Sequence, residues 1–136
     1  MSFFEDIRQA IEKQFSANWA TTDIAWDNVE YTPNAATSFV SIKIEYMNVA
    51  LASIAASPIH RATGNIIISI MVPMNTGTNT IRGYVDSIVT IFKNKKLSNI
   101  VQCLSPYTRR IGDIGEHYQM NVIVPFYADK SLANAS

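Results

Sequence analysis

The chain has 136 residues, of which 48% are hydrophobic and only 16% are charged. This length and apolar content suffice for one hydrophobic core, so we expect a single domain. Eleven basic side chains balance eleven acidic ones, which argues against a duplex-DNA-binding protein because such a surface needs a basic excess. So little charge repulsion between copies favours self-association.

The number of cysteines and the charges near the N-terminus indicate the cellular compartment in which the protein works. Cys103 is the single cysteine, which excludes an internal disulfide and a multi-cysteine metal site and fits a reducing compartment. The first fifteen residues carry five charged side chains and lack the apolar run of a signal peptide. No segment approaches the roughly 20 apolar residues of a membrane span. We therefore expect assembly in the cytoplasm, with no membrane partner.

An amphipathic helix is predicted at the N-terminus. Ser2 and Glu5 have capping-box spacing, which marks a helix start. The apolar residues that follow recur at helical spacing and form one stripe: Phe4, Ile7, Ala10, Ile11 and Phe15. We expect this stripe to pack on a sheet of the same chain.

Strands are predicted next. Trp26 to Tyr31 indicates a short strand that ends before the turn at Pro33, and residues 39–46 alternate between apolar and polar side chains, as in a strand with one wet face. Residues 49–56 predict a further strand, residues 57–63 a connection, and residues 65–72 a buried β-branched strand.

The second half begins with another helix. Gly77, flanked by threonines able to cap, precedes apolar residues at helical spacing that end before Lys93, Lys95 and Lys96. Strands are then expected at 100–104, 107–111 and 118–127, with a turn at 112–115. This order predicts an α+β fold in which two amphipathic helices pack on a mainly antiparallel sheet. We expect one domain over residues 1–128 and a polar C-terminal tail over 129–136.

Candidate chemistry is sparse. A nucleophile needs a base within reach, and the only possible pairs are Cys103 with His60 or His117, neither supported by a local signature. Cys103 lies in an apolar stretch and is expected to be a buried structural thiol. No metal-ligand spacing or phosphate-binding loop is present, so we expect no catalytic residue, metal or cofactor. A small enzyme or ligand-binding domain remains the alternative, and it would need clustered titratable groups.

Two basic clusters could contact a partner. One is Lys93, Lys95 and Lys96, and the other is Arg109 with Arg110, beside Tyr107. Solvated charges are the default interpretation, and the alternative is contact with a nucleic-acid backbone or an acidic protein surface. The tyrosine favours an interface at the arginines, because Tyr and Arg are enriched at interface centres.

Several blocks, in their order, resemble the tail terminator (tail completion, or minor tail) proteins of tailed bacteriophages. The blocks span most of the chain, and their order carries the likeness. They are the N-terminal helix, Ile24 to Pro33, Arg61 to Gly64 before a long apolar strand, Val72-Pro73 with Asn75 to Thr78 before the second helix, and Tyr118 to Tyr127. The chain departs from the pattern over Ala50 to His60, and the role of that segment stays open.

The resemblance implies a virion structural protein, not an enzyme. It would form a homo-oligomeric ring, commonly a hexamer, that docks on the last ring of the tail tube protein, stops its polymerisation and provides the surface for a head-completion or neck protein. DNA would only pass through the ring, at the head-proximal end of the tail. We expect interface residues among Arg61, Tyr107, Arg109 and Arg110. A head-completion or neck connector subunit is the alternative role within the virion.

Overall fold

The computed structural model describes residues 3–27, 29, 31–32, 37–53, 59–74 and 77–131. Over these residues the chain forms one α+β domain with two helices and a seven-stranded sheet, which confirms the predicted fold class. The elements in chain order are α1 (Phe3–Asn18), β1 (Asp23–Ala25), β2 (Phe39–Ser53), β3 (Ile59–Pro73), α2 (Thr78–Phe92), β4 (Lys96–Leu97), β5 (Val101–Cys103), β6 (Tyr107–Ile114) and β7 (His117–Ser131).

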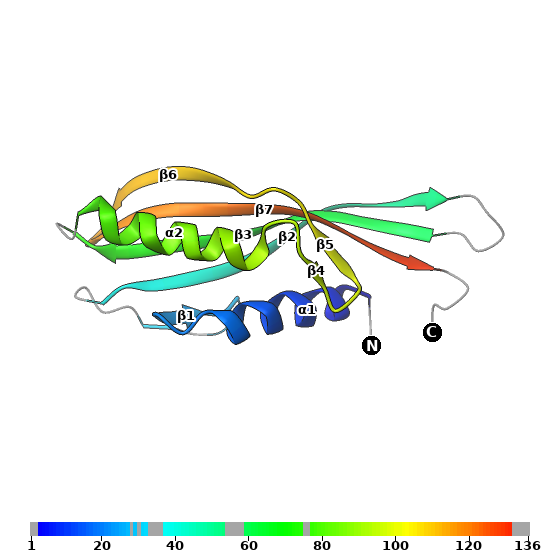
Figure 1. The fold of residues 1–136 in the computed structure, drawn as a ribbon, viewed down its shortest axis with the longest axis horizontal. Coiled ribbons are helices and arrows are strands. Elements are labelled where there is room, and N and C mark those ends of the chain that lie inside the picture. The colour runs from blue at the N-terminus through cyan, green and yellow to red at the C-terminus, as the bar shows by residue number, and fades with distance from the viewer. Residues whose placement is uncertain are drawn as a thin grey trace.

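Three long antiparallel strands form the centre of the sheet. The strand order is β1-β2-β3-β7-β5-β4, and β6 also pairs with β7. β5 pairs with residues 126–128 of β7 and β6 pairs with residues 117–123, so the two strands occupy successive stretches of the same edge. β1 alone is parallel to its neighbour. The far ends of β2, β3 and β7 extend beyond the N-terminal end of α1 (Figure 1).

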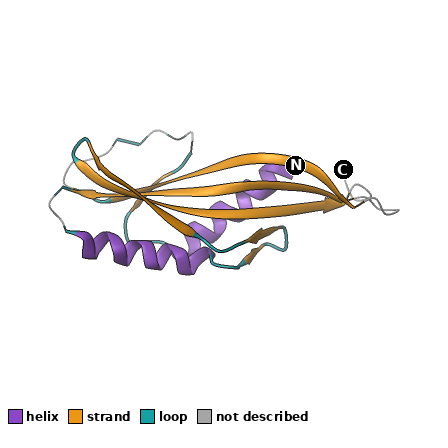
Figure 2. Ribbon diagram, turned by 90° about the horizontal axis from the view of Figure 1, so that it is seen from above, coloured by secondary structure: helices purple, strands orange, loops and turns teal. Residues whose placement is uncertain are grey.

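Both helices cover the same face of the sheet (Figure 2). Alternate residues of β3 point into this layer and are fully buried or nearly so: Ala62, Ile66, Ile68, Ile70 and Val72. The intervening residues of β3 face the opposite side, which neither α1 nor α2 covers, and they are only partly buried. One face of the sheet therefore makes the core and the other is open.

The apolar stripes of the two helices are buried as predicted, except at Phe4, which lies at the start of α1 beyond the helix-covered core and is 42% exposed. Ile7, Ile11 and Phe15 of α1 have no exposed surface, and the ring centre of Phe15 lies 5.8 Å from that of Phe92 in α2. Ser2 lies outside the described residues, so its capping role stays a prediction. The N-cap of α2 is Gly77 itself, at φ 89° and without a side-chain cap.

The predicted break between residues 57 and 63 is wrong. β2 runs without interruption from Phe39 to Ser53, and β3 already begins at Ile59. Residues 59–63 pair with residues 127–131 of β7, so the ladder extends through His60 and Arg61. Residues 54–58 lie outside the described residues.

Smaller corrections concern strand ends. The first short strand is β1, at Asp23–Ala25, and not the segment that ends near Tyr31, because Trp26 leaves the sheet edge to pack edge-on against Phe15 at 6.3 Å. The expected turn at 112–115 is shorter, since β6 continues to Ile114 through a bulge and turns only at residues 115–116. β7 includes the first three residues of the expected tail, and residues 132–136 are not described.

Candidate interaction surface

The cysteine is a structural group, as predicted. Cys103 of β5 has no exposed surface, and burial raises the pKa of its thiol to about 12. The thiol is therefore protonated at neutral pH and is a poor nucleophile. Residue 103 pairs with residue 126 of β7, nine positions from His117, which corresponds to about 30 Å along the strand. These two residues cannot form a catalytic pair.

His117 is the first residue of β7 and is buried at that end of the sheet. Its ring is 8% exposed, lies edge-on to Phe39 at 5.3 Å, and its Nε2 is 3.1 Å from the backbone oxygen of Thr37. The side chain of His60 is not described. Within the described part of the chain, no three His, Cys, Asp or Glu residues gather as a possible metal site.

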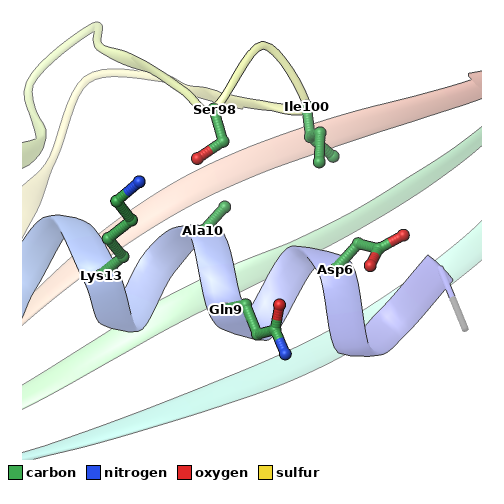
Figure 3. A pocket seen from close by; sticks show the side chains of 6 residues that line it. All are labelled: Asp6, Gln9, Ala10, Lys13, Ser98 and Ile100. Carbon is green, nitrogen blue, oxygen red and sulfur yellow. The ribbon is translucent and has the colours of Figure 1, made fainter. Parts of the chain in front are cut away.

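A small depression lies between α1 and the β4–β5 turn. It has a volume of about 190 Å³, and Figure 3 shows its lining residues. Ala10 faces the turn that carries Ser98 and Ile100, whereas the Gln9 amide points away from Ser98 (Figure 3). Because its polar groups do not converge on one point, the depression lacks the arrangement that orients a small ligand.

The exposed side chains of β6 make this strand the most open part of the described sheet. Seven of its eight residues are exposed, and the eighth, Gly112, is partly buried. Three large apolar side chains lie on it: Tyr107, Ile111 and Ile114, with exposed fractions of 48%, 39% and 50%. Such apolar exposure along a strand is typical of a surface that binds a partner.

The two adjacent arginines of β6 face opposite sides of the sheet. Arg109 pairs in register with Asn121 and shares the open face with Tyr107. Arg110 lies on the other face, where its Nε donates a hydrogen bond of 2.8 Å to the Tyr118 hydroxyl. The sequence had grouped the two as one basic cluster, but strand alternation separates them.

Arg61 lies apart from these residues and is already engaged. Its Nε and one terminal nitrogen donate to the two carboxylate oxygens of Asp129 at 2.8 and 3.0 Å. Its guanidinium also lies 4.2 Å from the ring centre of Tyr127. The Asp129 carboxylate raises the pKa of Arg61, so this residue ties β3 to β7. Arg61 pairs with Asp129 of β7 and Tyr107 pairs with Ile123 of β7. These two pairing positions are six residues apart along β7, which corresponds to about 20 Å.

The opposite edge of the sheet carries a second open region that the sequence did not predict. Met47 is 71% exposed beside Tyr46 at 39% on β2, and Phe4 of α1 is 42% exposed. The Tyr46 hydroxyl donates to the Phe4 backbone oxygen at 3.2 Å, and the two rings lie 4.6 Å apart. Strand order decides which strand is at an edge, so sequence periodicity alone could not identify this region.

Two known protein structures have a fold similar to that of this chain. No protein-family model and no curated protein sequence matches the chain. One similar solved structure, a protein with only a sequence identifier for a name, is 18% identical over 96% of both chains, with a TM-score of 0.71. Another is a chain of the virion of a native gene transfer agent particle, 18% identical over 91% of this chain and 95% of that one, with a TM-score of 0.63.

Among the described residues, neither α1 nor α2 is long and apolar enough to cross a membrane.

Proposed function

We propose that this chain is a virion structural protein: the ring-forming tail terminator of a tailed phage or a related particle. The observation that carries the proposal is the fold that it shares, over more than nine tenths of both chains, with a chain of the gene transfer agent virion. The ordered sequence blocks that resemble tail terminators supply the specific role.

The chemistry of the surface supports a role in assembly. Cys103 is buried and far from His117, and the polar groups of the depression beside α1 do not converge. These features favour a function based on protein–protein contacts. An open sheet face and exposed apolar side chains at its edges supply surfaces for such contacts. A head-to-tail contact that repeats by rotation closes into a ring, and a ring can cap a tube of matching symmetry.

In this role the ring, commonly of six copies, binds the last ring of the tail tube protein and ends its growth. Its opposite side then receives the head-completion or neck protein. DNA passes through the ring, and the net charge of zero leaves no excess of basic groups to hold it. The exposed residues Tyr107, Arg109 and Arg110 are our candidates for interface residues, within the ring or with these partners, and Arg61 is a more distant candidate.

The proposal is tested by making particles without this protein and measuring their tails by electron microscopy. Tubes of abnormal and variable length, without attached heads, are the expected result. Tails of normal length joined to heads would overturn the proposal. Headless tails of uniform, normal length would instead support a head-completion or neck connector role, because growth control would then lie elsewhere.

A further inference from the structure

Apart from the short terminal strands β1 and β4, two edges of the sheet have no strand neighbour among the described residues. β6 pairs with β7 on one side only, and β1 covers only residues 39–41 of β2. From Ile42 onward, the described part of the chain therefore places β3 on one side of β2 and no strand on the other. Each edge presents unpaired backbone N–H and C=O groups, which are a template for another strand.

Bulges limit the regular stretch of each edge. On β2 the pairing register shifts between Tyr46 and Asn48, and on β6 it shifts between Arg110 and Gly112. A bulge disrupts regular pairing, so the usable stretches are Ile42 to Tyr46 and Tyr107 to Arg110. The two stretches are of similar length, which suits them to each other.

Exposed apolar side chains gather near both edges. Nine large apolar side chains are exposed in the described chain. Four of them lie along the β5–β6 edge: Leu104, Tyr107, Ile111 and Ile114. Three more lie at the β2 edge and the adjoining start of α1: Phe4, Tyr46 and Met47. Burying both groups in one contact would remove this apolar surface from water.

The two parts of the chain differ in charge, although the charges of the whole chain sum to zero. Before residue 54 there are seven acidic and three basic side chains, and after residue 58 there are four acidic and eight basic ones. On the β2 side, Asp27, Lys43 and Glu45 are exposed, which leaves one acidic group in excess, and on β6 Arg109 and Arg110 are exposed. Within the described residues, neither Glu45 nor Arg109 has an ion-pair partner. Opposite net charges favour contact between a β6 edge and a β2 edge, and they disfavour contact between two edges of the same kind.

Strand direction is also compatible with a ring. β2, β3, β7 and β6 are joined by three antiparallel pairings, so β2 and β6 run in opposite directions. A second copy in the same orientation therefore places its β2 antiparallel to the β6 of the first. Since rotation about an axis roughly along the strands preserves this orientation, the contact can repeat around a closed ring.

We infer that neighbouring copies of this chain join edge to edge, with Tyr107 to Arg110 of one copy antiparallel to Ile42 to Tyr46 of the next. Sheet hydrogen bonds, the apolar groups beside both edges and the opposite charges act together in this contact. The inference rests on the proposed ring and names the surfaces that close it.

Complementary charge reversals test the inference. In one variant, Arg109→Glu with Arg110→Glu makes the β6 edge acidic. In the other, Asp27→Lys with Glu45→Lys makes the β2 edge basic; Asp27 lines the same depression as Ile42 and Tyr46. The control is Arg82→Glu with Lys93→Glu, which makes the same charge change as the first variant at exposed positions of α2 and its end.

In a ring made of either edge variant alone, the β6 edge of one copy would meet a β2 edge with net charge of the same sign. We expect its self-association, measured by native mass spectrometry and sedimentation, to weaken at least about tenfold, while the control assembles as the wild type does. An equimolar mixture of the two edge variants should restore rings in which they alternate. One chain carrying all four substitutions should restore rings by itself. Restoration excludes misfolding as the cause of the loss.

The outcomes separate the two proposals. A wild type that forms rings while both edge variants assemble normally overturns the edge contact and leaves the ring intact. Loss in the β6 variant alone, with no rescue on mixing, means that β6 meets a different surface and also overturns it. A wild type that stays monomeric both alone and on the ends of purified tail tubes overturns the proposed ring itself.

Discussion

Gly64 lies at a point in the sheet where no side chain fits. It pairs with Tyr46 on β2 and with Phe126 on β7. A Cβ at this position would overlap the backbone oxygen of Glu45 and lie 3.0 Å from Cζ of Phe126. The Phe126 ring is 2% exposed and has little room to withdraw, and the Glu45 oxygen belongs to the neighbouring backbone. The Gly64→Ala variant must therefore push β2 away from β3.

Overpacking of this kind costs about 1–3 kcal/mol of unfolding free energy. Gly83 provides a matched control, since the same added Cβ has nothing within 4 Å. Gly83 lies inside α2, where alanine is more favourable than glycine by about 0.5–1 kcal/mol. The two variants add the same methyl group to one chain, and the structure predicts opposite signs.

Urea unfolding followed by circular dichroism measures both effects. With a slope of about 1–3 kcal/mol per M, Gly64→Ala should lower the midpoint by about 1 M and Gly83→Ala should raise it slightly. All proteins must be compared at one low concentration, because ring formation would add apparent stability. A Gly64→Ala midpoint equal to or above that of the wild type would refute the close approach of the two strands.

Three further predictions follow from the core and the open face. Phe15→Ala removes a fully buried ring that contacts the rings of Trp19, Trp26 and Phe92, and it should cost about 3–5 kcal/mol in the same assay; a loss below about 1 kcal/mol would contradict this packing. The Cys103 thiol should resist alkylation in the native protein and react once it unfolds. Its pKa is raised on folding from 9.0 to about 12, so the native state binds the proton more tightly; stability is lost as the pH rises from about 9 to 12, and Cys103→Ala should show less of this alkaline loss. Arg61→Ala breaks an exposed ion pair with Asp129 and should leave the urea midpoint nearly unchanged, because solvent screens exposed pairs; a clear drop in the midpoint would contradict this.

Local periodicity was enough to identify the main elements. The stripes that end in Phe15 and Phe92 gave both helices, because helical spacing directly encodes a buried face. The alternation from Phe39 onward likewise gave a strand with one open face. The buried state of Cys103 followed from its apolar neighbours.

Features set by distant pairing were not accessible in this way. β4 has two residues and β1 has three, too few to show a period, and each exists because another strand lies beside it. The extension of β3 through His60 and Arg61 depends on β7 supplying partners such as Asp129. Strand alternation alone could have predicted that Arg109 and Arg110 lie on opposite faces of the sheet. The open edge of β2 could be predicted only with knowledge of the strand order.

The position of this protein on the particle tests the account most directly. Purified virions and isolated tails can be labelled with gold-tagged antibody fragments against the chain and viewed by electron microscopy. We expect label at a single place, the head-proximal end of the tail, both in whole virions and on tails without heads. Label spread along the tube, at the distal tip, or on heads but not on tails would contradict it.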